Sequence, residues 1–238
     1  MTSIAANLQA VRARLAAACA CADRSPSSVR LLAVSKTWPV EALREAHAAG
    51  QTEFGESYVQ EALEKIRTLA AASVATAATP LTWHFIGPLQ SNKTRPVAEH
   101  FDWVHSIERL KIAERLSAQR PAERAPLQVC IQVNVSGEAS KSGCAPHDAA
   151  ALAQAIVALP RLRLRGLMAI PEPSEDIALQ RRRFALLREL KDQLNATGLA
   201  LDTLSMGMSH DLEAAILEGA TQVRVGTAIF GGRNYSPT

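Results

Sequence analysis

The sequence lacks the features that mark membrane-spanning, secreted and nucleic-acid-binding proteins. Nowhere do about 18 apolar residues follow one another without a charge, which excludes an apolar transmembrane helix. The first residues lack the basic-then-apolar order of a signal peptide, so we expect a cytoplasmic protein with no membrane partner. Lys and Arg number 26 against 23 for Asp and Glu, an excess too small to indicate a nucleic-acid partner.

Cysteine is also scarce. The four cysteines are too few and too irregularly spaced for a disulfide framework. Cys19 and Cys21 are separated by one residue, so they do not form a CxxC motif. We therefore expect buried or incidental thiols, and we predict no metal site.

What the sequence does contain is a regular alternation of short β-rich runs with longer helical patterns. This order is typical of βα units that build a parallel sheet. Eight runs qualify as candidate strands, and an amphipathic helix precedes the first of them. The candidate strands are residues 29–35, 52–55, 81–87, 103–107, 127–135, 162–170, 201–207 and 221–231.

Eight βα units in 238 residues match the size of a (β/α)₈ barrel. We predict an α/β protein that forms a single barrel domain over residues 1–238, with an extra N-terminal helix. An open doubly wound sheet would usually carry a glycine-rich loop after its first strand, whereas "SKTWP" follows here. The alanine-rich stretch 70–80 is predicted to be a mobile connection.

Lys36 ends the first candidate strand, "LLAVSK", where barrel enzymes place their functional groups. Such a lysine is either an ordinary polar end of a strand or an amine held for covalent chemistry with a carbonyl. The stretch alone favours the ordinary explanation.

The last two candidate strands carry a second pattern, "SMGMSHDLEAAILEGATQVRVGTAIFGG". The loops after strands seven and eight of such barrels often bind phosphate through backbone N–H groups. Gly226 would allow a phosphate near the backbone, and Ser209 and Thr227 offer hydroxyl donors. Ser209 also fits a plain helix cap, and these motifs alone leave both explanations open.

Arg224 places a charge inside an otherwise apolar strand, so its side chain needs a partner. In a closed barrel the eighth strand neighbours the first, which brings Arg224 and the Gly226–Thr227 loop beside Lys36. A lysine for an aldehyde, donors for a phosphate and a partner for a ring nitrogen are what pyridoxal 5′-phosphate (PLP) requires.

These motifs resemble the pyridoxal phosphate homeostasis proteins, whose barrel is similar to the N-terminal domain of alanine racemase. The matching stretches occur in family order over nearly the whole chain: "AVSKTWP", "FGESYVQE", "WHFIGPLQSNK", "VHSIE", "VNVSGEASKSG", "LRGLMAIP", "SMGMSHD" and "VRVGTAIFG". The resemblance implies that Lys36 forms a Schiff base with PLP and that Arg224 contacts the pyridine nitrogen. It also implies that Ser209, Gly226 and Thr227 hold the phosphate.

The resemblance further places His84, Lys141 and Met206 near the cofactor. One departure is visible, because the family usually carries Asn where this chain has Ser57 in "FGESY". The shorter side chain implies weakened or rearranged contacts there, with cofactor binding retained. Lys141 has an equally good explanation as a solvated loop lysine.

We expect a monomeric, non-catalytic PLP carrier that buffers the cofactor or delivers it to PLP-dependent enzymes in their apo form. A racemase of this fold needs a second base opposite the lysine, which alanine racemase takes from a C-terminal domain. This chain ends at Thr238, and neither Tyr58 nor Tyr235 clearly takes that role. The alternatives are a racemase-like or decarboxylase enzyme, and a class I aldolase that uses Lys36 without a cofactor.

Overall fold

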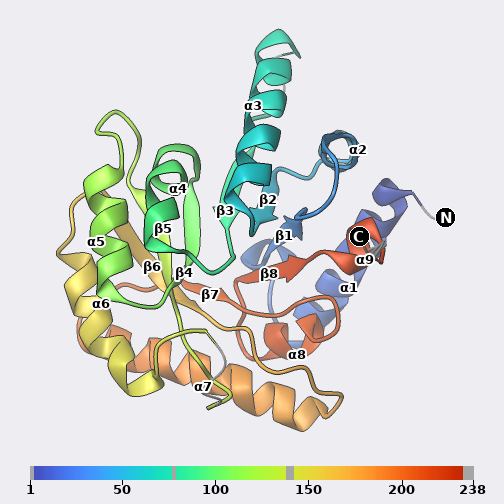
Figure 1. Ribbon diagram of the computed structural model, residues 1–238. Helices are drawn as coiled ribbons and strands as arrows, with labels where there is room; N and C mark the ends of the chain where they lie inside the picture. Colours follow the sequence, from blue (N-terminus) through green and yellow to red (C-terminus); the bar gives the residue numbers. More distant parts are fainter. Residues whose placement is uncertain (1–2, 77–78, 138–141, 233–238) are drawn as a thin grey trace, which may run out of the picture.

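The computed structural model describes residues 3–76, 79–137 and 142–232, and eight parallel strands close into a barrel (Figure 1). The strands follow one another in sequence order, and β8 closes the barrel by pairing with β1. The predicted (β/α)₈ barrel is therefore confirmed. The strands are β1 (Arg30–Val34), β2 (Glu53–Glu56), β3 (Thr82–Phe85), β4 (Trp103–Ile107), β5 (Leu127–Gln132), β6 (Leu162–Met168), β7 (Thr203–Ser205) and β8 (Gln222–Val225).

Helices surround the barrel and connect its strands (Figure 1). The predicted N-terminal helix precedes β1, and within the described ranges no helix is both long and apolar enough to cross a bilayer. The α-helices are α1 (Ile4–Cys21), α2 (Val40–Ala48), α3 (Val59–Thr76), α4 (Thr94–His100), α5 (Leu110–Gln119), α6 (Ala149–Val157), α7 (Ile177–Ala196), α8 (Leu212–Leu217) and α9 (Thr227–Phe230). Short 3₁₀ turns cover Pro26–Ser28, Ser91–Lys93 and Pro146–Asp148.

Two predicted boundaries are wrong. The alanine-rich stretch 70–80 is not a connection throughout, because α3 continues to Thr76. Alanine is the strongest helix former, so a run of alanines extends a helix that is already nucleated. The eighth strand ends at Val225, and the apolar residues that follow Gly226 form α9 instead.

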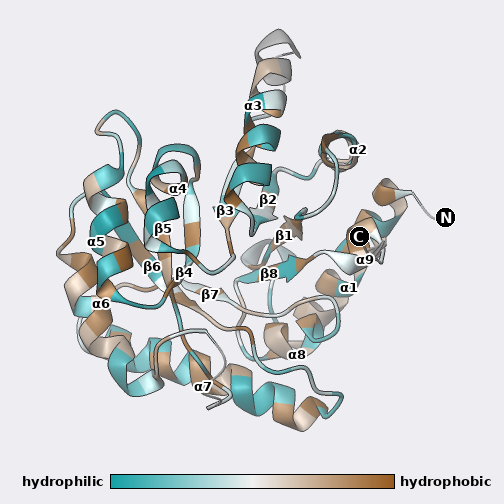
Figure 2. Cartoon of the chain, in the orientation of Figure 1, coloured by the Kyte–Doolittle hydropathy of each residue, from teal (hydrophilic) through white to brown (hydrophobic). Residues whose placement is uncertain are grey.

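The barrel buries side chains in two places, between its strands and the surrounding helices and inside its lumen. The main hydrophobic core lies between strands and helices, whose brown faces in Figure 2 mark their apolar residues. Along β1, Ala33 belongs to this outer core, whereas Leu32 and Val34 form a separate small cluster with Ile86. Since alternate residues of a strand face opposite sides, the small cluster lies inside the barrel.

Helix α1 forms hydrogen bonds to the loops after the last two strands. Asn7 Nδ2 donates a hydrogen bond to the carbonyl oxygen of Ile229 in α9 (2.8 Å). Arg14 Nη2 donates to the carbonyl oxygen of Ser209 (3.0 Å) and also pairs with Glu213. The extra helix therefore holds the two segments that the sequence predicts to bind phosphate.

Gly166 in β6 is required by the close approach of β7. A Cβ atom at this position would overlap the carbonyl oxygen of Thr203, which the barrel wall cannot move without breaking strand pairing. We predict that Gly166→Ala lowers the free energy of unfolding by about 3 kcal/mol or more. Urea unfolding followed by circular dichroism measures this loss.

Gly232→Ala is the matched control, because a Cβ there meets no atom within 4 Å. This variant should unfold within about 0.5 kcal/mol of the wild type. Equal stability of the two variants would contradict the close packing of β6 on β7.

Candidate functional site

Lys36 lies in the turn between β1 and α2, at the carboxyl end of the barrel strands. Trp38 N–H donates to the carbonyl oxygen of Ser35 (3.1 Å), which closes the turn around the lysine. Thr37 has a φ of 69°, a left-handed conformation that is costly for a β-branched residue. The turn therefore needs support from its surroundings.

That support is a buried cluster of charges on α3 and β2. Lys65 Nζ donates hydrogen bonds to Glu56 Oε1 (2.8 Å), Glu61 Oε1 (2.5 Å) and the carbonyl oxygen of Ser35 (2.7 Å). The side chains of Lys65 and Glu56 are 4% and 0% exposed, so this ion pair is removed from solvent screening. Burial raises the pKa of the Glu56 carboxyl, and the charge of Lys65 opposes this rise.

The cluster holds the backbone on both sides of Lys36. Ser35 contributes its carbonyl oxygen to Lys65 and its hydroxyl to Glu56 Oε1 (2.6 Å). Thr37 N–H donates to Glu61 Oε1 (2.6 Å). The residues before and after Lys36 are thus fixed by one ion cluster, which accounts for the strained φ of Thr37.

Arg224 lies in β8, on the strand that neighbours β1. Its Nη1 donates to the carbonyl oxygen (2.6 Å) and the hydroxyl (2.7 Å) of Ser205, and its Nη2 donates to the carbonyl oxygen of Ala169 (2.8 Å). Burial lowers the pKa of Arg224 to about 10, so the guanidinium stays charged at neutral pH. Among the described residues, nothing accepts a hydrogen bond from Nε or from the second Nη2 proton.

The loops after β7 and β8 lie side by side and are joined by a hydrogen bond. Ala228 N–H, in the first turn of α9, donates to Ser209 Oγ (3.4 Å). Gly207 has a φ of 93°, and a Cβ there would lie 2.6 Å from the side chain of Ala215. A Cβ at Gly226 would lie 3.1 Å from the carbonyl oxygen of Val34. The glycines thus bring these backbone segments together.

An aromatic contact connects the lysine turn to α9. The rings of Trp38 and Phe230 are stacked with centroids 5.8 Å apart. Trp38 also approaches Gly231, which ends α9. The elements that carry Lys36, Ser209 and Thr227 are therefore in mutual contact at one end of the barrel.

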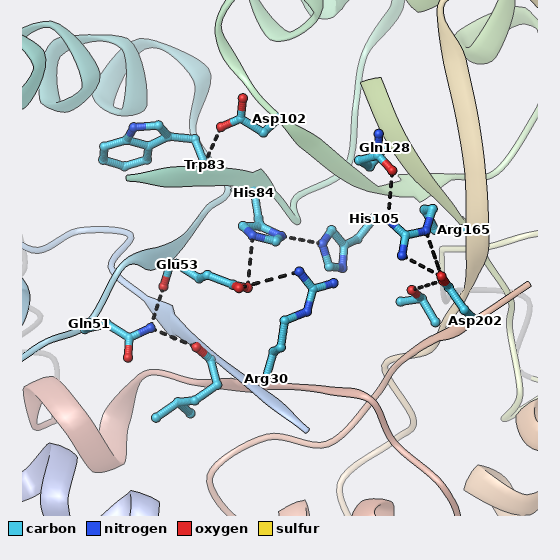
Figure 3. A network of polar contacts seen from close by, with 12 residues as sticks. Arg30, Gln51, Glu53, Trp83, His84, Asp102, His105, Gln128, Arg165 and Asp202 are labelled. Carbon is cyan, nitrogen blue, oxygen red and sulfur yellow. Dashed lines mark hydrogen bonds and ion pairs between the residues drawn. The ribbon is translucent and has the colours of Figure 1, made fainter. Parts of the chain in front are cut away.

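The lumen beneath this site is polar. Figure 3 shows Arg30, Glu53, His84 and His105 pointing toward one another, with Arg165 beside them bonded to Asp202 and Gln128. The guanidinium carbons of Arg30 and Arg165 lie 4.9 Å and 5.1 Å from the centre of the Trp103 ring, which is the distance of cation–π contacts. The Trp103 ring also stacks on His84, with centroids 5.5 Å apart.

Sequence comparisons assign this barrel to a family. A family model for the N-terminal domain of alanine racemase matches residues 6–234. The pyridoxal phosphate homeostasis protein of Pseudomonas aeruginosa is 64% identical over 235 residues, which are 99% of this chain and 98% of that protein. The chain belongs to the pyridoxal phosphate homeostasis protein family. The Escherichia coli protein of this name is 54% identical over 241 residues, 99% of each chain.

Solved structures agree with the family assignment. The PipY protein of Synechococcus elongatus, whose structure has PLP bound, shares 39% of its residues with this chain at a TM-score of 0.80. The match covers 96% of this chain and 100% of that protein. The family resemblance inferred from the motifs is thus confirmed.

Most of the site residues predicted from the sequence lie on neighbouring strands. Lys36, Ser209, Arg224, Gly226 and Thr227 belong to β1, β7 and β8 or to the segments that follow them, and these strands are consecutive in the barrel. Ser209 is not the cap of α8, because that helix begins at Leu212 after Asp211. The Ser209 hydroxyl instead faces the first turn of α9.

The remaining predicted residues lie elsewhere around the site. The backbone of Ser57 lies against Gly87, where a Cβ would lie only 2.6 Å from the Ser57 carbonyl oxygen. Met206 is fully buried in the outer hydrophobic core of this family member. His84 is fully buried in the lumen rather than at the mouth. Lys141 lies outside the described residues, as does Tyr235.

Sequence reasoning missed the residues that support Lys36 and Arg224. Glu61 and Lys65 have the four-residue spacing of an ordinary surface ion pair on a helix, so the sequence gives no sign that Lys65 is buried. His105 in "WVHSI" did carry a signal, because it is a polar residue inside a buried strand, as Arg224 is.

We predict that Lys65→Met destabilises the protein by about 3–5 kcal/mol, because Glu56 would remain buried without its partner. The turn that carries Lys36 would lose its carbonyl hydrogen bond in the same variant. Urea unfolding measures the stability, and amide hydrogen exchange of residues 35–38 reports the turn.

Arg95→Met is the matched control, since Arg95 and Glu99 have the same four-residue spacing on α4 but Arg95 is exposed. Its loss should be below about 0.5 kcal/mol. A Lys65 variant as stable as this control would contradict the structural role of the cluster.

Two lumen histidines predict a pH dependence of stability. Burial lowers the pKa of His84 against the opposing effect of Glu53, and burial together with the nearby positive charge of Arg224 lowers that of His105 well below 6.5. Below pH 6.5 the unfolded chain therefore binds protons that the folded chain does not. The histidines' contribution to the free energy of unfolding is fully present above this pH. It is lost as the pH falls below it, by up to about 1.4 kcal/mol per pH unit for each histidine.

Urea unfolding at pH 7.5, 6.5 and 5.5 measures this slope, with His105→Gln as the comparison. The variant should lose the part of the slope that belongs to one histidine. Glu56 contributes an opposite slope in both proteins, so the difference isolates His105. Identical slopes would contradict a neutral His105 in the folded state.

Proposed function

We propose that this protein binds PLP reversibly through Lys36 and serves PLP homeostasis, by buffering the cofactor or delivering it to apo forms of PLP-dependent enzymes. The observation that carries the proposal is the placement of Arg224 on β8 and of Lys36 in the turn that follows the paired strand β1. The names of the relatives and the PLP-bound PipY structure support it. We further propose that it acts as a single-domain monomer in the cytoplasm.

The residues present fit each part of the cofactor. Lys36 supplies an amine for the aldehyde. The two guanidinium protons of Arg224 that no described residue accepts suit a pyridine nitrogen, which is an acceptor when it carries no proton. The backbone of Gly226 and the hydroxyls of Ser209 and Thr227 suit the phosphate, at the start of α9.

Formation of the linkage requires only Lys36 and the aldehyde, and its reversal requires only water. The neutral Lys36 amine attacks the aldehyde carbon, the carbonyl oxygen leaves as water, and a C=N Schiff base remains. Addition of water to the same bond restores the free lysine and the free aldehyde. The reaction needs no other reactant, which suits a carrier that must both take up and release its cargo.

Arg224 suits a protein that only holds the cofactor, and it equally suits a racemase that works by concerted proton transfers. PLP supplies an electron sink to enzymes when its ring nitrogen is protonated. A permanently charged guanidinium beside that nitrogen disfavours a second positive charge in a buried site. The Ser205 and Ala169 contacts hold Arg224 in this orientation, so the chain's own residues keep the ring a weak sink.

Three further residues complete the proposed site. Ser57 directly follows β2, where the family usually carries Asn. Met206 lies between Ser205 and Gly207 and fixes the end of β7 by burying its side chain in the outer core. His84 lies in the lumen and is linked to Ser205 through one side chain, that of His105.

The test is the visible spectrum of purified protein incubated with PLP, before and after borohydride reduction. We predict a band near about 420 nm that reduction removes, with a pyridoxyl group on the Lys36 peptide in mass analysis. Lys36→Ala should lose the band and remain folded, because a partly exposed lysine in a turn contributes little to the core.

Lys93→Ala is the control, because Lys93 lies in the loop after β3 and has no proposed role. It should retain the band and the adduct. Absence of both in the wild type would contradict PLP binding, and aldol cleavage by a colourless protein would then favour an aldolase. Turnover of an amino acid that depends on Lys36 would favour a racemase-like enzyme over a carrier.

A further inference from the structure

A continuous row of polar contacts crosses the barrel lumen from Glu53 to Arg224. Glu53 Oε2 lies 3.4 Å from His84 Nε2, and His84 Nδ1 lies 2.9 Å from His105 Nε2 (Figure 3). His105 Nδ1 is 2.7 Å from Ser205 Oγ, which accepts a hydrogen bond from Arg224 Nη1 at 2.7 Å. The four side chains between Arg224 and the barrel's amino end come from β2, β3, β4 and β7.

The contact between Glu53 and His84 is the longest of the row. Glu53 Oε2 and His84 Nε2 are both buried, and neither atom has another hydrogen-bond partner among the described residues. Each atom is therefore the available partner of the other. Burial alone would raise the pKa of Glu53, but the His84 contact and the charge of Arg30 outweigh it and lower that pKa.

The chemistry of Arg224 sets the direction of every hydrogen bond in the row. A guanidinium only donates, so Ser205 Oγ accepts from it and has its own proton available for His105 Nδ1. His105 then carries its proton on Nε2 and donates to His84 Nδ1. His84 in turn carries its proton on Nε2, directed at Glu53. This assignment follows from the network, and it leaves both histidines neutral.

The charged groups around the row oppose protonation of the histidines. Arg30 lies 3.5 Å from Glu53 and faces both histidines, and Arg224 faces His105. Glu53 and Asp102 act in the opposite direction on His84. Burial is the largest effect for both rings and lowers the pKa of each. A neutral relay between a carboxylate and a guanidinium is the arrangement consistent with all of these groups.

We propose that Glu53, His84, His105 and Ser205 are positioning residues that fix the Arg224 guanidinium against the cofactor ring. This inference rests on the proposed PLP function. The row occupies one Nη1 proton of Arg224, while the carbonyl oxygens of Ser205 and Ala169 occupy two others. Three contacts on one edge prevent rotation of the guanidinium and direct its remaining donors away from the row.

The first experiment compares His105→Phe and Ser205→Ala with the wild type, by PLP titration of the visible band. Each variant breaks the row at one link, so the dissociation constant of PLP should rise about tenfold. Thr203→Val is the matched control. Thr203 lies on the same strand as Ser205, is buried, and directs its hydroxyl to Asp202 outside the row.

A pH titration of the visible band of the PLP-bound proteins gives a midpoint that would not change if the row had only a structural role. A loosened Arg224 allows the ring nitrogen to bind a proton, and this charge disfavours a proton on the Lys36 linkage. The midpoint of the spectral change should fall by about 0.5 pH unit or more in both variants. The Thr203→Val midpoint should match the wild type.

The third readout uses the protein without cofactor. Nitrogen-15 NMR of the wild type should show His84 and His105 as neutral rings with the proton on Nε2. A proton on Nδ1 of either ring would overturn the direction of the row, and this result needs no variant to fold. Thermal unfolding of each variant separates a loss of affinity from a loss of structure.

The outcomes separate this inference from the proposed function. A wild type that binds PLP, together with variants of unchanged affinity and midpoint, overturns the positioning role alone. A wild type that takes up no PLP overturns the proposed function and the positioning role with it. Weaker PLP binding and a lower midpoint in both variants, with an unchanged Thr203→Val control, support the proposal that the row positions Arg224.

Discussion

The burial of Arg224 is the constraint on which the site depends. A guanidinium cannot lose its charge at physiological pH, so the lumen must supply acceptors wherever it lies. Ser205 and Ala169 supply three of them. Other barrels of this kind fill the lumen with branched apolar residues, whereas here the apolar lumen residues that the structure describes form two small clusters. The polar lumen is therefore a consequence of placing a permanent charge beneath the mouth.

The two chemical groups of the mouth are supported from opposite sides of the barrel wall. Arg224 is held from inside, by neutral side chains that end on one carboxylate. Lys36 is held from outside, by the ion cluster of Lys65, Glu56 and Glu61 that fixes the backbone of its turn. Because β1 and β8 pair directly, these separate supports set the position of one group relative to the other. A change in either support alters the same site.

The sequence predicts the fold and the outline of the site, because both depend on local patterns. Strand alternation, helical spacing and closure of the barrel place Lys36 beside the strand of Arg224. The limits arise where tertiary contacts decide. Glu61 and Lys65 resemble a surface pair in the sequence, but α3 packs against the lysine turn and buries Lys65. Met206 and His84 carry no local sign of which face of the barrel wall they occupy.

A row of neutral histidines has a physical advantage over an ion pair made directly with Arg224. A carboxylate in contact with the guanidinium would neutralise it and weaken its opposition to a proton on the ring nitrogen of the proposed cofactor. Glu53 lies at the far end of the row, behind two imidazoles and a hydroxyl, and is itself paired with Arg30. The row thus satisfies hydrogen bonding while it keeps the compensating charge distant. Arg224 is oriented by the row, and its positive charge remains directed at the mouth.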